Sequence, residues 1–258
     1  MKKVLAIGNS FSQDSNKWLQ KLVDSAGEEI TFYNLHIGGC SLDRHWSNIA
    51  EDDIPDYALE MDGEKQGRIG LRAALAMHKY DYITIQQRSG FSGLKETYYP
   101  FADNLVKYLT QVQPQAEIIV HQTWAYQVGS THGDFPIYSC DQEKMFLALK
   151  DAYNELAVKM GQYTPSKKPL RIIPNGEIFQ RCRAEKIFAD DNICLNRDGF
   201  HASLIHGRYM LGASWFMAFT GKDISKANFL PEGMTNEEAD VINKNVREVM
   251  KEYGWETK

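Results

Sequence analysis

Residues 2–12 read KKVLAIGNSFS, and they pass from an apolar run into a turn-forming sequence. The apolar run, Val4 to Ile7, predicts a strand whose two faces are both buried, as in a sheet covered by two layers of helices. Gly8 permits the tight turn that follows, and Ser10 comes where the strand has ended. Because open α/β sheets keep their sites at the carboxyl ends of parallel strands, we expect Ser10 to lie at such a site.

Similar apolar runs alternate with segments of helical period along the chain, and this alternation is typical of a parallel sheet covered by helices on both faces. The sequence therefore predicts an α/β fold of three layers, α/β/α, with a five-stranded parallel sheet. The predicted strands are 2–7, 30–35, 82–87, 117–123 and 171–174. The predicted helices are 14–26, 68–77, 97–112, 141–160, 202–219 and 236–253.

The domain organisation follows from the same patterns. An acidic stretch contains the dipeptide Asp62-Gly63, which suits a tight hairpin turn, and predicts a β-hairpin insertion at about 52–68. We expect a single domain over residues 1–221. Residues 222–258 are expected to form a C-terminal helical extension packed on that domain.

Composition excludes several classes of function. The chain has 258 residues, 43% of them hydrophobic, and a formal net charge of -5, so it lacks the positive charge that nucleic acid or an anionic membrane surface would require. The four cysteines show no C-x-x-C spacing, and the histidines show no metal-binding pattern. We therefore expect no metal, no cofactor, no nucleic acid and no membrane partner. The sequence does not specify an oligomeric state.

The localisation expected from this chain is cytoplasmic. The apolar run after the two N-terminal lysines is too short for a signal peptide, and no stretch is long enough to span a bilayer. A secreted or periplasmic location would require a signal removed from a longer precursor.

A second polar motif, NRDGFH, occupies residues 196–201 before a long helical segment. A carboxylate and an imidazole three residues apart, Asp198 and His201, can be arranged so that the first holds one ring nitrogen while the other nitrogen faces a nucleophile. Taken alone, an Asp-x-x-His pattern is more often a helix cap beside a surface histidine. A lone serine after a strand is likewise more often part of an ordinary turn.

Together the two motifs resemble the SGNH/GDSL hydrolase family. That family has a Gly-Asp-Ser-Leu-like block after strand one and an Asp-x-x-His block before the final helix, and here these blocks read Gly8-Asn9-Ser10-Phe11 and 198–201. Order, spacing and structural context agree over residues 1–221. The resemblance implies a flavodoxin-like SGNH fold with a catalytic triad of Ser10, His201 and Asp198.

The family's oxyanion hole uses a glycine amide after strand two and an asparagine side chain after strand three. The resemblance assigns the first role to Gly39, in the sequence Ile-Gly-Gly-Cys-Ser. The third block departs from the family pattern, because Gln86 and Gln87 stand where the asparagine is expected. A glutamine amide can donate the same hydrogen bond, and we favour Gln87 over Gln86. This departure, with Asn9 in place of the usual aspartate, indicates a divergent branch.

The resemblance implies a serine esterase that hydrolyses a short-chain ester through an acyl-enzyme and needs no cofactor. An O-acetyl group on a carbohydrate is the expected substrate, because the polar, aromatic segment after strand four suits a sugar, and Trp124 would line the cleft. A lipase or thioesterase of the same family is the enzymatic alternative. The alternative from another class is a non-catalytic carbohydrate-binding domain with the SGNH fold.

Overall fold

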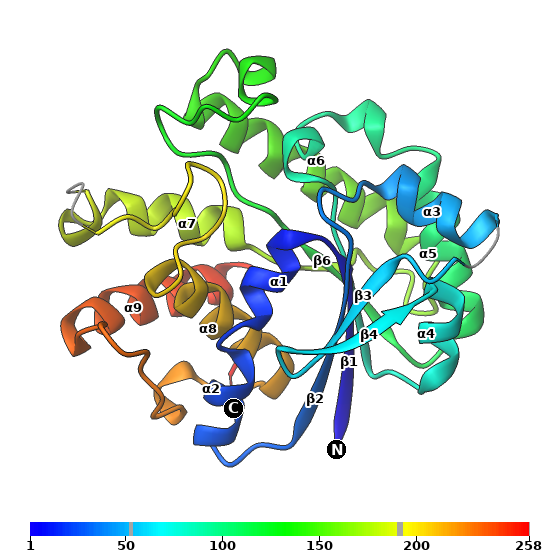
Figure 1. Ribbon diagram of the computed structural model, residues 1–258, viewed down its shortest axis with the longest axis horizontal. Coiled ribbons are helices and arrows are strands. Elements are labelled where there is room, and N and C mark those ends of the chain that lie inside the picture. Colours follow the sequence, from blue (N-terminus) through cyan, green and yellow to red (C-terminus); the bar gives the residue numbers. More distant parts are fainter. Residues whose placement is uncertain (52–53, 190–192, 258) are drawn as a thin grey trace.

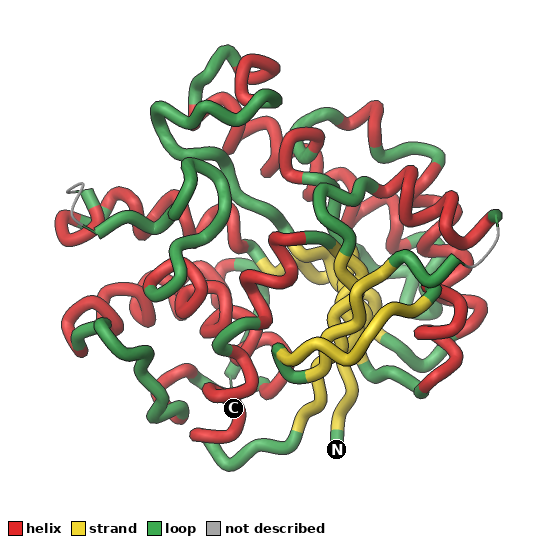
Figure 2. The backbone as a smooth tube through the Cα atoms, in the orientation of Figure 1, coloured by secondary structure: helices red, strands yellow, loops and turns green. Residues whose placement is uncertain are grey.

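The computed structural model describes residues 1–51, 54–189 and 193–257. Seven strands in this part of the chain form one sheet, in the order β4-β3-β2-β1-β5-β6-β7. Figure 1 shows α2, α8 and α9 on one side of the sheet and α3, α4 and α5 on the other. Figure 2 shows the same layering, with a twisted central sheet between two sets of helices.

The strands are β1 (Lys2–Gly8), β2 (Ile30–His36), β3 (Tyr57–Met61), β4 (Glu64–Ile69), β5 (Tyr82–Ile85), β6 (Glu117–His121) and β7 (Arg171–Ile173). The α-helices are α1 (Ser10–Asn16), α2 (Leu19–Ser25), α3 (Leu42–Ala50), α4 (Leu71–Met77), α5 (Phe101–Val112), α6 (Gln142–Gly161), α7 (Asn175–Ala184), α8 (His206–Thr220) and α9 (Asn236–Glu252).

The central strands are parallel and in register at their carboxyl ends. Ile7 of β1 pairs with Leu35 of β2 and with Ile85 of β5, and Ile85 in turn pairs with Val120 of β6. These strands are almost completely buried, as the continuous apolar runs predicted. The segments that follow β1, β2, β5 and β6 therefore leave the sheet at one edge, where the candidate site residues were expected.

The prediction of five strands was too low. The five predicted strands are present and parallel, but β3 and β4 extend the sheet as an antiparallel hairpin on β2. The hairpin turns at Asp62 and Gly63, both with positive φ, as that dipeptide predicted. It was treated as an insertion because β4 is polar and exposed and lacks the apolar run of a central strand. Residues 52–53, where the predicted insertion begins, lie outside the described residues.

The helices also differ from the prediction at several boundaries. The predicted first helix is two helices. Helix α1 begins earlier than expected because Asn9 caps it. Its buried side chains are mostly polar, so the apolar pattern of the sequence did not indicate it. Helix α5 begins directly after Pro100, because proline lacks the amide hydrogen that a residue inside a helix donates. Helices α3 and α7, which the pattern did not predict, are short.

The C-terminal segment packs on the same body. Helix α9 contacts α7 and α8, and the Trp255 indole donates a hydrogen bond to the carbonyl of Ile172 in β7 at 2.7 Å. Within the described residues, none of the helices has the length and apolar character needed to cross a membrane.

Candidate active site

Ser10 is the first residue of α1, directly after the turn that ends β1. Gly8 makes the turn possible, because a Cβ at this position would lie only 2.4 Å from Ser12 Oγ. The Asn9 side chain caps α1 by accepting a hydrogen bond from the Phe11 amide at 3.0 Å. The close approach and the cap together fix the backbone that carries Ser10.

Asp198 and His201 lie in a closed loop before α8. The Arg197 amide donates to the His201 carbonyl at 3.1 Å, and Asn196 pairs with Ala202 in an isolated antiparallel bridge. Asp198 Oδ1 accepts a hydrogen bond from the His201 amide at 2.8 Å, so it caps the turn. The other oxygen of this carboxylate remains available for the imidazole, so capping and ring orientation use the same side chain.

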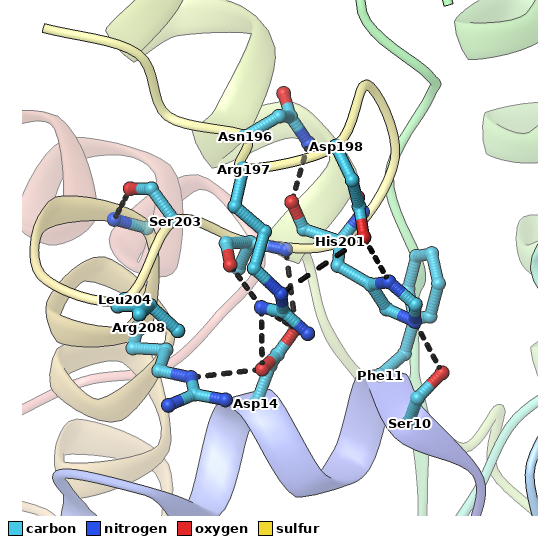
Figure 3. A network of polar contacts seen from close by, with 12 residues as sticks. Ser10, Phe11, Asp14, Asn196, Arg197, Asp198, His201, Ser203, Leu204 and Arg208 are labelled. Carbon is cyan, nitrogen blue, oxygen red and sulfur yellow. Dashed lines mark hydrogen bonds and ion pairs between the residues drawn. The ribbon is translucent and has the colours of Figure 1, made fainter. Parts of the chain in front are cut away.

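The three side chains form a continuous chain of hydrogen bonds (Figure 3). Ser10 Oγ lies 2.8 Å from His201 Nε2, and His201 Nδ1 lies 2.7 Å from Asp198 Oδ2. Partial burial raises the pKa of the Asp198 carboxyl, but the hydrogen bonds from His201 outweigh burial and hold this pKa below its usual value. Asp198 therefore stays ionised at neutral pH and fixes the orientation of the ring.

The chain of hydrogen bonds ends in a pocket of about 480 Å³ at the carboxyl edge of the sheet. Five segments line it: 9–11, 38–39, 88–89, His132 and 200–201. They come from the segments that follow β1, β2, β5 and β6 and from the loop before α8. The structure thus brings Ser10 and His201 together with the predicted glycine, from segments separated by up to about 190 positions in the sequence.

Gly39 lies in the predicted place on the loop after β2. Its φ of 62° is in the left-handed region that favours glycine, and a Cβ there would meet open space. Asn9 holds this loop by donating from Nδ2 to the Cys40 carbonyl at 3.0 Å. An aspartate at position 9 could not donate this hydrogen bond, which gives a physical reason for the departure from the family motif.

Gln86 and Gln87 reach the correct edge, but their side chains do not line the pocket. Gln87 Nε2 donates to the carbonyl and the hydroxyl of Thr97, both at 3.1 Å, and Gln87 Oε1 accepts from the Leu42 and Arg88 amides. Both glutamines are almost completely buried. The structure therefore corrects the prediction that Gln87 donates to an oxyanion, because its donors are already engaged inside the protein.

Gln86 joins a separate buried network. Its Nε2 donates to Asn9 Oδ1 at 2.8 Å, and its Oε1 lies 2.9 Å from Nδ1 of His121. His121 is buried, and burial lowers its pKa to about 3, so the ring is neutral and its Nδ1 carries the proton that Gln86 accepts. Gln86 thus holds the side-chain oxygen of Asn9 that caps α1, and it does not line the pocket.

Trp124 is also placed differently from the prediction. It is fully buried and stacks on Phe11 at 4.1 Å and on Phe179 at 4.7 Å between ring centroids. Its Nε1 donates to the carbonyl of Phe200 at 2.7 Å. Trp124 therefore packs behind the residues next to Ser10 and His201, and has no surface left to contact a substrate.

Sequence reasoning gave no role to several residues that line the pocket, among them Arg88, Ser89, His132 and Phe200. Ser89 Oγ lies 3.0 Å from the hydroxyl of Tyr126, and Arg88 pairs with Asp134. Partial burial lowers the pKa of His132, which keeps its ring neutral. The missed signal was the strand end, because β5 stops at Ile85 and the next turn carries residues 88–89 to the pocket.

The described part of the chain contains no group of three or more His, Cys, Asp or Glu side chains that could hold a metal ion. The polar groups of the pocket are instead hydrogen-bond donors and acceptors: a hydroxyl pair, an imidazole pair and a guanidinium. Such a set can bind and polarise a carbonyl compound.

Comparison with known proteins agrees with this geometry at the level of the fold. Residues 3–248 match the family described as "Domain of unknown function (DUF4886)". The crystal structure of a DUF4886 family protein from Bacteroides uniformis is 34% identical, with a TM-score of 0.88 over 100% of this chain and 97% of that chain. No curated protein matches the chain.

Two more distant structures show the fold class. A protein from Slackia heliotrinireducens, provisionally described as an SGNH hydrolase, is 19% identical, with a TM-score of 0.57 over 84% of this chain and 98% of that chain. A carbohydrate esterase family 3 protein from Talaromyces cellulolyticus is 14% identical, with a TM-score of 0.52 over 85% of this chain and 97% of that chain. The fold therefore resembles that of SGNH hydrolases.

Proposed function

We propose that this chain, which belongs to the DUF4886 family, is a serine esterase that removes a short acyl group, in the first place an O-acetyl group, from a carbohydrate. The observation that carries the proposal is the chain of hydrogen bonds from Ser10 through His201 to Asp198, which opens on a pocket. Hydrogen bonds of this length and order are what activation of a serine requires.

The tautomer of His201 sets the direction of proton transfer. Nδ1 donates to the ionised Asp198, so Nε2 carries a lone pair toward Ser10 Oγ. As Oγ forms a bond to the ester carbonyl carbon, its proton moves to Nε2. The tetrahedral intermediate then collapses, the C–O bond to the alcohol breaks, and the alcohol oxygen takes that proton. Water repeats the sequence on the acyl-serine and releases the acid, and Ser10 recovers its proton.

The negative oxygen of each tetrahedral intermediate needs donors, and two backbone amides are suitable. The amides of Ser10 and Gly39 have no hydrogen-bond partner among the described residues, and both residues line the pocket. The Ser10 amide is also one of the free N–H groups in the first turn of α1, where partial positive charge favours an anion. Each such donor contributes about 10²- to 10³-fold to kcat in comparable enzymes.

Ser89 is the best candidate for a third donor in place of the two glutamines. It follows the same strand, lines the pocket and has its Oγ 3.0 Å from the Tyr126 hydroxyl. Burial raises the pKa of Tyr126, so its hydroxyl stays protonated and can donate to Ser89. The Ser89 hydroxyl can then direct its own proton at the oxyanion.

The pocket supports a polar substrate with a short acyl group. Arg88, Ser89 and His132 supply hydrogen-bonding groups, while Phe200 supplies aromatic surface. Such a mixture suits the hydroxyls and the apolar face of a sugar. A long acyl chain would need an extended apolar groove, and the residues that line this pocket do not form one.

The test is labelling by a fluorophosphonate probe, followed by hydrolysis of p-nitrophenyl esters and of acetylated xylan. We expect the native protein to be labelled, Ser10→Ala to be unlabelled and Ser12→Ala, two positions away on the same buried helix, to retain labelling. Rates should fall from acetyl to longer esters, and acetate should be released from the polysaccharide.

Each other outcome identifies an alternative. A preference for octanoyl or longer esters would favour a lipase or thioesterase. Absence of labelling in the folded native protein would contradict esterase activity and favour a carbohydrate-binding domain. Binding of acetylated oligosaccharides without turnover, measured by calorimetry, would then support that second class.

A further inference from the structure

Asp14 lies one helical turn after Ser10 on α1, and therefore on the same side of the helix. Its side chain is only 1% exposed, yet it is surrounded by donors. Oδ1 accepts from Arg197 Nη1 at 2.9 Å and from Arg208 Nε at 2.8 Å. Oδ2 accepts from Arg197 Nη1 at 2.9 Å and from the Ala202 amide at 3.1 Å. The carboxylate is thus fully satisfied, and the triad described above does not include it.

Two of these partners flank Asp198 and His201 in the sequence. Arg197 immediately precedes Asp198, and Ala202 immediately follows His201. The Arg197 guanidinium also donates to the Ala202 carbonyl, so the two ends of the segment are tied to each other as well as to Asp14. Figure 3 shows Asp14 beneath this loop and Ser10 further along the same helix, with contacts from both reaching the loop.

We propose that Asp14 is a positioning residue that sets the distance and angle between Ser10 and His201. This inference rests on the proposed function, because the position of Ser10 affects turnover only if Ser10 reacts with a substrate. One rigid helix carries both the nucleophile and the anchor of the loop that carries the base. The loop is therefore held at two points, at Ser10 through the His201 ring and at Asp14 through the residues on either side of the pair.

A purely structural role is the competing explanation, and Arg208 separates the two. Arg197 and Arg208 each donate to Asp14, so loss of either removes one guanidinium from a buried carboxylate. Arg197 belongs to the loop that carries His201, whereas Arg208 belongs to α8. Arg197 Nε also lies 4.0 Å from Asp198 Oδ2, so its loss weakens a contact with the proposed triad as well, and exchange of the loop is therefore read beside kcat in each variant. If Asp14 acts only through charge balance, loss of either arginine should change exchange of the loop equally. If it acts through loop position, Arg197 should matter for turnover and Arg208 for stability.

The experiment compares Asp14→Asn, Arg197→Met and the matched control Arg208→Met. For each we would measure kcat and KM on p-nitrophenyl acetate, the thermal midpoint, and hydrogen–deuterium exchange of the peptide that contains 196–205. We expect Asp14→Asn and Arg197→Met to lower kcat by about 10- to 100-fold with little change in KM, since small displacements of a reacting group have effects of that size. Both should speed exchange of the Ala202 amide.

We expect Arg208→Met to lower the thermal midpoint as much as Arg197→Met while kcat stays within about threefold of the native value. Equal losses of kcat in the two arginine variants, or unchanged exchange of 196–205 in Asp14→Asn, would overturn the proposal. If Asp14→Asn does not fold, the pair of arginine variants still decides. If the native protein hydrolyses no ester, the proposed function fails, and the exchange data alone decide whether Asp14 holds the loop.

Discussion

Two segments that leave the sheet at the same edge use their polar side chains in opposite ways. After β1, Ser10 directs its hydroxyl toward His201 and the pocket. After β5, Gln86 and Gln87 direct both ends of their amides into the protein, toward Asn9 and Thr97 among others. Both segments carry polar residues at the carboxyl end of a parallel strand, which was the feature that singled them out in the sequence.

The difference shows that position at a strand end is necessary for a site residue but does not suffice. A buried amide must satisfy its donors and acceptors, because an unsatisfied one costs about 1–3 kcal/mol. Gln87 meets this need with four hydrogen bonds inside the protein, so it has no donor left for a substrate. Ser10 has its hydroxyl bonded to His201, and that hydrogen bond is the one from which a proton can be withdrawn.

The largest effect that would test this comparison is loss of Ser10, the proposed nucleophile. Ser10→Ala or His201→Ala should each lower kcat by at least about four orders of magnitude, and the double variant should lose little more, because the two side chains act as a unit. Asp198→Asn should be milder than Ser10→Ala. The measurement is turnover of p-nitrophenyl acetate under saturating substrate. Independent, multiplicative losses from the two alanine substitutions would contradict the assignment.

The parts of the fold that the sequence predicted are those with strong local signals. Continuous apolar runs identified the five parallel strands, and Asp62-Gly63 identified the hairpin turn. The hairpin's place in the sheet was missed because β4 is exposed and polar, so only its pairing with β3 makes it part of the sheet. Helix α1 was missed as a separate helix because its buried face is polar. Tertiary hydrogen bonds, which no periodicity reveals, stabilise that face.

The candidate site divides in the same way. Ser10, Gly39, Asp198 and His201, which the structure brings to one place, could be proposed from the sequence because each lies in a motif with a fixed place beside a strand or helix. The direction of a side chain after a strand end cannot be read from the sequence. For this reason the sequence did not show that Gln87 and Trp124 point into the protein. The contribution of Asp14 was invisible for another reason, since its partners lie about 185 positions away.

A smaller effect would sharpen the comparison on the β5 side. Ser89→Ala should lower kcat by about 10- to 100-fold with little change in KM, because a donor to the oxyanion strengthens mainly in the transition state. Ser92→Ala is the matched control. Ser92 is buried in the same turn, but its hydroxyl donates to the Ser89 carbonyl and lies outside the pocket lining. Equal kcat values for the two variants would remove Ser89 from the oxyanion hole.

The glutamine side of the comparison is tested by stability. Gln87→Ala should lower the free energy of unfolding by about 2–4 kcal/mol, because it leaves buried groups without partners, and kcat should fall less than in Ser89→Ala. Gln113 is a buried glutamine far from the site that donates to the Leu75 and His78 carbonyls, so Gln113→Ala serves as the control. Chemical denaturation and turnover are measured for both variants. If Gln87→Ala alone lowered kcat by about two orders of magnitude or more, that result would return Gln87 to the oxyanion hole.

The smallest expected effect, taken per pH unit, is a pH dependence of stability that comes from the buried network of Gln86 and His121. Burial lowers the pKa of His121, which bonds Gln86, from its ordinary value of 6.5 to about 3. Between these pH values the unfolded chain binds a proton that the folded chain does not, so this contribution to stability is complete above about pH 6.5 and is lost as the pH falls toward 3, at up to about 1.4 kcal/mol per unit.

His45, also buried with a pKa lowered to about 3, should contribute a second proton. His121→Gln should therefore reduce the slope of unfolding free energy against pH by about one proton between about pH 6 and 4, and His45→Gln by the same amount, as measured by urea denaturation. An unchanged slope in His121→Gln would mean that this histidine is charged in the folded protein, which would undo the assignment of Gln86 as its fixed acceptor and reopen the question of which way that amide points.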